Sequence, residues 1–334
     1  MSRLSPLLTA AAVLWLAAPS VASAMTFGEK EVARVNSFGG SCVKCELSGR
    51  NMEGARIVGA DFSGAALVGA NLRSARFHAS NFAGADLSRA DLSDASMAGA
   101  DFSRANLSSA KLRATEADGV SFGSANLTRA DLSDTQATGA NFRKAVLTHA
   151  TLRAVEMRGG MFSEAELTRV NLSDAGLQGA NFSRAVMQSA VLRAAEMHGA
   201  NLSRVDAQGA DFRDAELNGA VLSSGRFTRA SFRAADLTGA VLSGGSFDGA
   251  DFRDADLTKT LIAGVDLSKA RGLDQDQIDE ACADSRTKLP AGLTGRSCSS
   301  VRFVVHRKPA KPARPPAPPA PPAPPAPRYI VSIP

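Results

Sequence analysis

Two adjacent five-residue segments, ADLSR at residues 85–89 and ADLSD at residues 90–94, carry the pattern that decides the fold. Each segment places a small residue first, a polar residue second, Leu or Phe third, and two mostly polar residues last. The bulky third position, which we call the centre, falls on every residue number ending in 2 or 7 from Met52 to Leu267, in about 44 repeats without insertion or deletion. A long internal repeat of fixed period indicates a solenoid.

A period of five fits neither a helix nor a flat strand. On a helix, each step of five residues rotates the apolar stripe by about 140°, and on a strand it moves the stripe to the opposite face. A chain that bends at every repeat instead turns the centre, and the small residue two positions before it, toward a common axis. Four bends close a coil of twenty residues. We therefore expect stacked coils that pair through their backbones about 4.8 Å apart.

A second period, of twenty residues, supports a stack of four-sided coils. Phenylalanine occupies the centre at Phe62, Phe82, Phe102, Phe122, Phe142, Phe162 and Phe182, and again at Phe212, Phe232 and Phe252. Rings one coil apart would lie at a favourable distance for aromatic pairs. The second series is displaced by half a coil, which predicts that it follows the opposite wall.

Three centres carry only alanine, namely Ala117, Ala137 and Ala207. The first two are one coil apart, so they predict a narrowing or an underpacked region of the interior. A binding pocket there is one hypothesis. Compensation by the neighbouring rings of Phe122 and Phe142 is the interpretation that we favour.

The repeat resembles that of the pentapeptide-repeat family, whose motif is Ala, then Asp or Asn, then Leu or Phe, then two variable residues. The resemblance covers about two-thirds of the chain. It implies an all-β fold, a right-handed quadrilateral parallel β-helix in which the centre and the preceding small residue point inward. We expect a short α-helical cap at its C-terminal end, because Asp274 can cap a helix that continues through about Cys282.

The first segment, residues 1–24, is typical of a secretory signal peptide. It combines a basic start with an apolar run that is too short to span a bilayer as a helix. Small residues precede the predicted cleavage site between Ala24 and Met25. The alternative is an uncleaved anchor. The pattern predicts a periplasmic or secreted protein, from a Gram-negative bacterium, with no transmembrane segment after cleavage.

Four further segments follow the signal peptide. We predict an N-terminal cap at 25–49, the repeat rod at 50–270, a C-terminal cap at 271–300 and a basic, Pro-rich disordered tail at 301–334. An open end of a stacked-coil rod exposes unpaired backbone groups, so a cap is expected at each end. The Pro-Pro-Ala tract of the tail cannot form a core and favours an extended polyproline II conformation.

The chain contains four cysteines, Cys42, Cys45, Cys282 and Cys298. Export favours disulfides, and similar Cys pairs open exported pentapeptide-repeat proteins. For Cys42 and Cys45, half of a zinc site and a redox pair are the alternatives. Because the length of the rod separates the caps, we predict Cys42–Cys45 and Cys282–Cys298 pairs, although a tail folded back along the rod would remove that argument.

No arrangement of residues indicates catalysis. The His, Ser and acidic residues occur at positions set by the repeat, no Ser-His-Asp set can be singled out, and there is no Gly-rich phosphate loop. A filled rod also offers little of the concavity that substrate sites use. We therefore predict a protein that is not an enzyme and that uses no cofactor or metal.

The repeat region is almost neutral, with 24 Lys and Arg against 25 Asp and Glu between residues 50 and 270. We predict a non-enzymatic scaffold or interaction module of the bacterial cell envelope. Its partner would be an envelope protein or a cell-wall polymer, and a homodimer formed through a cap is a further hypothesis. The alternative is the DNA-mimicking topoisomerase protection known in this family. An uncompensated acidic surface and a cytoplasmic location would be needed for it, so no nucleic acid is expected as a partner.

Overall fold

Each repeat forms one side of a coil, because the chain turns sharply after every centre. In the repeat that opens the sequence pattern, Ala90 N–H donates to the carbonyl of Leu87 at 3.0 Å and closes a four-residue turn. Arg89, the third residue of that turn, has a φ of 59°. A positive φ at this position is typical of a type II turn. Glycine adopts it without strain and fills many equivalent corners, such as Gly69 with a φ of 63°.

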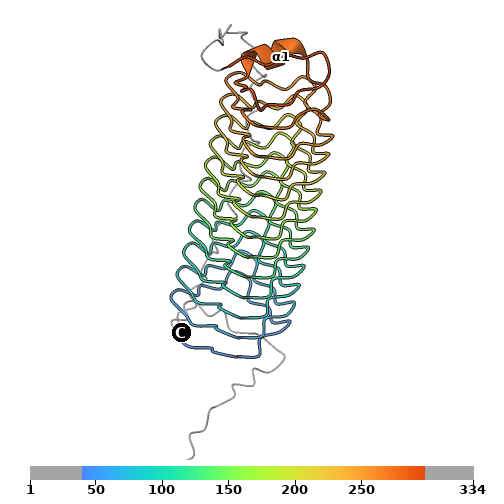
Figure 1. The fold of residues 1–334 in the computed structure, drawn as a ribbon. Coiled ribbons are helices and arrows are strands. Elements are labelled where there is room, and N and C mark those ends of the chain that lie inside the picture. The colour runs from blue at the N-terminus through green and yellow to red at the C-terminus, as the bar shows by residue number, and fades with distance from the viewer. Residues whose placement is uncertain (1–39, 298–334) are drawn as a thin grey trace, which may run out of the picture.

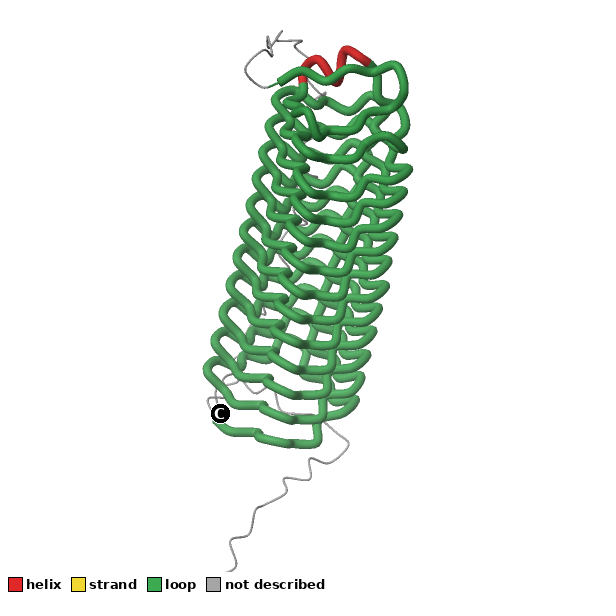
Figure 2. Tube along the Cα trace, in the orientation of Figure 1, coloured by secondary structure: helices red, strands yellow, loops and turns green. Residues whose placement is uncertain are grey.

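Successive coils are joined by backbone hydrogen bonds between residues about one coil apart. Leu87 N–H donates to the carbonyl of Asn106 at 2.7 Å, and Asp91 N–H donates to the carbonyl of Ala70 at 3.0 Å. Within the described residues the pairing consists of isolated parallel bridges and no longer strand, so Figure 2 draws the coils as loops. The predicted parallel pairing is therefore present, but the turn in every repeat leaves only one bridging residue on each side of a coil.

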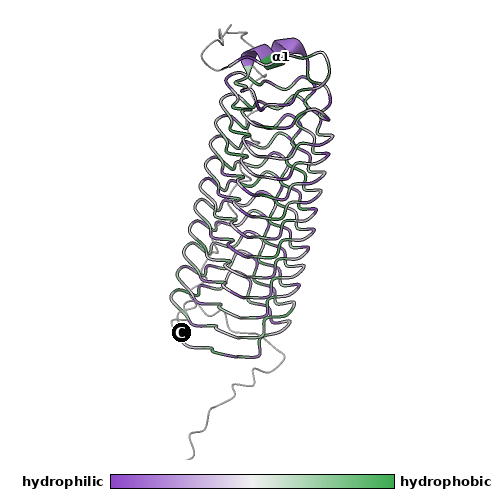
Figure 3. Cartoon of the chain, viewed as in Figure 1, coloured by the Kyte–Doolittle hydropathy of each residue, from purple (hydrophilic) through white to green (hydrophobic). Residues whose placement is uncertain are grey.

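The computed structural model describes residues 40–297, which form a rod of stacked coils with the helix α1 at one end (Figure 1). The predicted signal peptide, its cleavage site between Ala24 and Met25, most of the N-terminal cap, Cys298 and the tail at 301–334 lie outside the described residues. Apolar and polar residues are interspersed along the whole rod (Figure 3), as expected when every repeat contributes to one continuous core.

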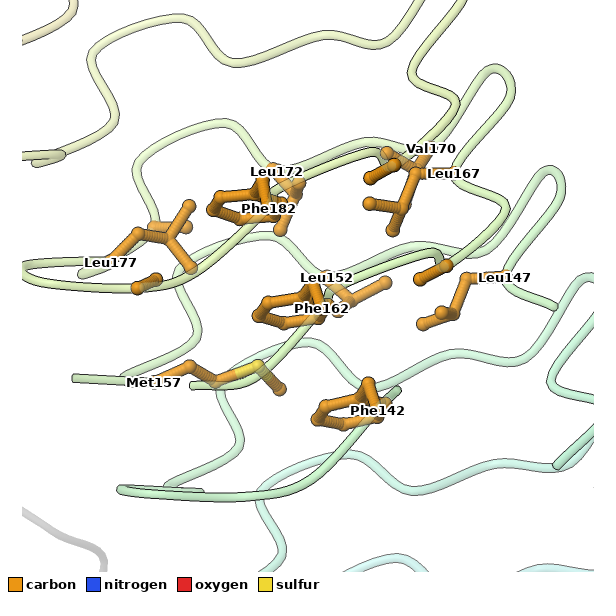
Figure 4. Packing of buried hydrophobic residues seen from close by; sticks show 14 of the residues in the cluster. Phe142, Leu147, Leu152, Met157, Phe162, Leu167, Val170, Leu172, Leu177 and Phe182 are labelled. Atoms are coloured by element: carbon orange, nitrogen blue, oxygen red, sulfur yellow. The ribbon is translucent and has the colours of Figure 1, made fainter. Parts of the chain in front are cut away.

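The core is a column of the inward side chains of every coil. From Ile57 to Leu267 all the centres are at most 2% exposed. The first phenylalanine series, from Phe62 to Phe182, forms a continuous stack with ring centroids 4.7–5.4 Å apart. Figure 4 shows Phe142 and Phe162 lying one above the other in this stack. The second series also stacks, at 5.1 and 5.2 Å. The ring contacts are those that the spacing predicts.

The change of wall between the two phenylalanine series exchanges a Phe and a Leu between opposite walls. The wall that carries Phe182 continues with Leu202, and the wall half a coil away changes from Leu192 to Phe212. Each of these coils therefore sets one Phe against one Leu across the interior. Because protein interiors are packed to a nearly uniform density, a second Phe opposite the first would overfill the column.

The alanine centres are compensated within their own repeats. In all three cases the preceding inward position, which is usually Ala, carries a β-branched residue, in the pairs Thr115–Ala117, Thr135–Ala137 and Val205–Ala207. All of these side chains are at most 1% exposed. The opposite exchange occurs where Gly225 precedes Phe227, since a Cβ at Gly225 would lie 2.5 Å from the Phe227 ring. Our expectation that neighbouring Phe rings compensate for Ala117 and Ala137 therefore missed the main partners, which are threonines.

At its N-terminal end the coil ladder begins earlier than we predicted. Ser41 already bridges Asp61, so the first coil includes part of the predicted cap at 25–49. Cys42 therefore takes a centre position and Cys45 takes the small position of the next repeat. Both pack against the core and are partly buried.

At the other end, α1 spans Gln275–Glu280 and covers the last coils. Asp274 is its N-cap, as predicted, and its side chain accepts a hydrogen bond from Gln277 N–H at 2.9 Å. The helix ends before the predicted Cys282, because Cys282 N–H donates to the carbonyl of Thr260 at 2.8 Å and the chain rejoins the ladder. Ile278, at 0% exposed, closes the core from above.

Candidate functional site

The interior of the rod is occupied by its own side chains. Even the buried hydroxyl groups are used by the backbone, since Thr135 Oγ1 donates to the carbonyl of Leu112 at 2.7 Å and Thr260 Oγ1 donates to the carbonyl of Leu237 at 2.7 Å. Buried polar groups that are bonded in this way stabilise the fold, and their donors are not available to a ligand. Any functional site of the described rod therefore lies on its exterior or at its ends.

One side of the rod, which we call the arginine face, carries a column of arginines at equivalent positions. Its members are Arg73, Arg113, Arg153, Arg193, Arg213, Arg233 and Arg253. In the lower coils each pairs with an aspartate of the next coil. Arg73 lies 3.2 Å from Asp94, and the equivalent pairs of Arg113 and Arg153 lie 3.4 Å from their aspartates. These exposed pairs contribute about 0–1 kcal/mol each, so they mainly neutralise stacked charges.

Asp211 is the most strongly perturbed carboxylate of the arginine face. Arg213 holds it with two hydrogen bonds of 2.8 and 2.7 Å, and Arg193 of the coil below adds a third. Partial burial by itself would raise the pKa of Asp211, but these hydrogen bonds outweigh it and lower the pKa to about 2. A carboxylate held this firmly in its charged form is suited to structure and not to proton transfer near neutral pH.

On a neighbouring side of the rod, most of the charged residues at the bridging positions are acidic. Its bridging positions include Glu116, Glu156, Glu196, Glu216, Asp236 and Asp256. Several of these carboxylates are bonded to side chains other than Arg, as in the 2.8 Å contact between His198 Nε2 and Glu216. The rod is therefore neutral as a whole but differs in charge from side to side.

The described residues hold no arrangement typical of an active site. Among residues 40–297 no three His, Cys, Asp or Glu side chains are grouped so that they could hold a metal ion. Two depressions on the surface of the described rod are shallow, and they are lined mainly by polar and charged side chains. No helix of the described region has the length and apolar character needed to cross a membrane.

The cysteines lie at the two ends of the rod. The sulfur atoms of Cys42 and Cys45 are 2.11 Å apart and form the predicted disulfide in the first coil. Cys282 is buried beside the last coils. Its predicted partner, Cys298, lies outside the described residues, although a bridge between Ala283 and Ser297 brings the adjacent chain segments together.

The sequence pattern predicted the core columns, but two features of the exterior and the cap were missed. One is a depression around Arg184 and Arg204, which occupy equivalent corners one coil apart. The signal that could have revealed this depression is the occurrence of Arg at two positions twenty residues apart. The other is Gln277, whose side chain reaches back to the rod, and no local pattern indicates this contact.

Two family models, both described as pentapeptide repeats, match the chain. One matches segments from residue 41 to 233 and the other matches residues 227–271. Together they cover more than half of the chain, and they describe a repeat and no catalytic domain. The chain belongs to the pentapeptide-repeat family.

Several solved structures are also similar to the chain. HetL, a pentapeptide repeat protein involved in heterocyst differentiation regulation from the cyanobacterium Nostoc sp. strain PCC 7120, is 32% identical, with 64% of this chain and 89% of HetL covered and a TM-score of 0.27. A pentapeptide repeat protein from the thylakoid lumen of Arabidopsis thaliana is 30% identical, with 31% and 70% covered and a TM-score of 0.25. QnrB1, a plasmid-mediated fluoroquinolone resistance protein, is 18% identical, with 75% and 94% covered and a TM-score of 0.31. No curated protein matches the chain.

Proposed function

We propose that this protein is a non-enzymatic scaffold or interaction module of the bacterial cell envelope. The observation that supports this most directly is the filled core, in which the centres from Ile57 to Leu267 are at most 2% exposed. A rod whose described interior is filled by its own side chains acts through the side chains that it displays in fixed columns and through its ends. Function has to be argued from such sites, because the fold alone does not define it.

The proposal includes the right-handed, four-sided β-helix that the family resemblance implies. It also includes a periplasmic or secreted location, after cleavage between Ala24 and Met25. The disulfide between Cys42 and Cys45 supports that location, because structural disulfides are typical of oxidising compartments. A Cys282–Cys298 disulfide belongs to the same proposal. Mass spectrometry of peptides from the non-reduced protein tests it, and a modified free thiol at Cys282 would contradict it.

The partner that we propose is an envelope protein or a cell-wall polymer. The tail at 301–334 has six Lys and Arg and no Asp or Glu, so it adds a basic spacer to a nearly neutral rod. Its last residues, YIVSI at 329–333, favour a strand that could add to the sheet edge of a partner. A homodimer through an end of the rod is a further form of the same proposal.

Crosslinking in intact cells, followed by purification from the envelope fraction, tests the proposal. The full chain is compared with a variant that lacks residues 309–334. We expect specific crosslinked species in the envelope fraction for the full chain, and fewer of them without the tail. Recovery of both proteins only from the cytoplasm would contradict the envelope role, and an unchanged crosslinking pattern would contradict the role of the tail.

A further inference from the structure

A shallow depression on one corner of the rod combines two arginines with several hydroxyl groups. It is lined by Ser183, Arg184, Asn201, Ser203, Arg204, Ser223 and Ser224, from three successive coils. Both arginines are exposed, and no carboxylate lines the depression. Their φ angles of 61° and 58° show that they occupy the same left-handed corner position of successive coils, so their backbones are about 4.8 Å apart.

A second depression of the same kind, on the arginine face, is electrically balanced. It is lined by two arginines and two aspartates, with Arg113 lying 3.4 Å from Asp134 and Arg153 lying 3.4 Å from Asp174. Stacked charges are therefore compensated there by carboxylates of the rod itself. The depression at Arg184 and Arg204 lacks this compensation, because it places two positive charges one coil apart without a carboxylate between them.

The acidic residue one coil below this corner and the one that follows it in the chain are engaged elsewhere. Glu164, one coil below Arg184 on the same corner, lies 3.7 Å from Lys144. Asp206, two residues after Arg204, lies 3.7 Å from Arg226 and accepts a hydrogen bond of 2.8 Å from Gln188. Within the described residues no ion pair joins Arg184 or Arg204 to a carboxylate.

The hydroxyl groups beside the arginines are also available. The backbone N–H of Ser183 donates to Asn181 Oδ1 at 2.9 Å, and that of Ser203 donates to Asn201 Oδ1 at 3.0 Å, so these turns are held without the serine hydroxyls. A hydroxyl can donate to an oxyanion, and the planar guanidinium group presents paired N–H donors that match phosphate geometry. The depression thus gathers donors and positive charge from three coils and offers no matching anion.

We propose that the corner formed by Arg184 and Arg204, with Ser183, Ser203 and Ser223, binds a phosphate or sulfate group. This inference rests on one part of the proposed scaffold function, namely that the protein acts through the exterior of the rod. A tetrahedral oxyanion has more acceptor sites than a carboxylate, so it can take donors from both guanidinium groups and from the serine hydroxyls together.

Titration of the purified full chain with sodium phosphate and with sodium sulfate, followed by NMR of backbone and arginine side-chain N–H groups, tests the site. The test variant is Arg184→Ser combined with Arg204→Ser. Ser124 and Ser224 already occupy the same corner position, with φ of 56° and 58°, so the fold accepts serine there. Arg104→Ser is the matched control, because Arg104 lies on the same corner between Gly84 and Ser124 and has no stacked arginine.

We expect shift changes centred on residues 183–184, 203–204 and 223–224, and a dissociation constant that is weakened about tenfold or more in the double variant. Arg104→Ser should change the constant by less than about twofold, and sodium acetate at equal ionic strength should bind more weakly than either oxyanion. Equal weakening by the control and the double variant, unchanged binding in the double variant, or equal affinity for acetate would overturn the assignment. None of these results depends on envelope crosslinking, so this site and the scaffold proposal can fail separately.

Discussion

At the scale of single residues, a local hydrogen bond explains why the position before the centre is often Asp or Asn. Its side-chain oxygen accepts a hydrogen bond from the N–H two residues later, as in Asp86 to Ser88 at 2.9 Å and Asn81 to Ala83 at 2.9 Å. Such a bond holds the start of the turn. In Asp–Asn stacks the Asn amide also donates to the carboxylate one coil below, as Asn81 does to Asp61 at 3.0 Å, so stacked like charges are avoided.

Asp211 gives a pH-dependent test at this scale. Its folded pKa of about 2 lies below the unfolded value of about 3.9. The stabilisation is therefore complete above about pH 4 and is lost as the pH falls through about 2. We expect Asp211→Asn to lower the free energy of unfolding by up to about 1 kcal/mol at pH 7, and urea unfolding at several pH values should show the difference closing between pH 4 and 2.

Asp254→Asn is the control for that measurement, since Asp254 is 74% exposed and its partner Arg233 is 3.8 Å away. It should change the stability little at any pH. A deficit of Asp211→Asn that persists unchanged near pH 2 would show that the carboxylate charge is not the source of the effect.

At the scale of the repeat and the cap, some repeats exchange volume between their two inward positions. Gly225→Ala should destabilise the rod by about 1–3 kcal/mol, because the added methyl group would lie 2.5 Å from the Phe227 ring and 3.2 Å from the carbonyl of Leu222. Phe227→Leu should relieve most of that cost. A double-mutant cycle followed by denaturant unfolding should give a coupling energy of about 1 kcal/mol or more, whereas additive effects would contradict volume exchange.

Where α1 interrupts the backbone ladder, one side chain supplies donors to carbonyls of the last coil. Gln277 Nε2 donates to the carbonyls of Phe252 and Ala255 at 2.9 and 2.8 Å. Gln277→Leu leaves these carbonyls without that donor, so we expect a loss of about 1–3 kcal/mol in thermal or denaturant unfolding. Asp276→Gln, on the exposed side of the same helix turn, should have a much smaller effect. Equal effects of the two changes would argue against this capping role.

The repeat could be predicted from the sequence to a much greater extent than the C-terminal cap. The period of five and the spacing of Phe62 and its equivalents predicted the coils, because each repeat makes the same local turn and needs no information from distant residues. The end of α1 at Glu280 and the role of Gln277 depend on where the last coil leaves unpaired carbonyls, which no local pattern records. The start of the ladder at Ser41 was missed because cysteines replace the usual Ala and Leu.

At the scale of the whole molecule, the rod combines an interior that is filled throughout with an exterior whose charge differs from side to side. The exterior departs from a self-neutralising pattern at the corner of Arg184 and Arg204. The sequence predicted that the exterior carries the function, because no catalytic arrangement was visible. The corner itself could be found only when residues twenty apart were placed side by side.

Thiol accessibility tests the filled core most directly. Leu152→Cys places a thiol at a centre that is 0% exposed, and Arg153→Cys places one at the next position, where the side chain is 66% exposed. Maleimide labelling of the native protein should modify the cysteine at position 153 at the rate of a free thiol and the one at position 152 at least about a hundredfold more slowly. Equal labelling rates at the two positions would contradict the account.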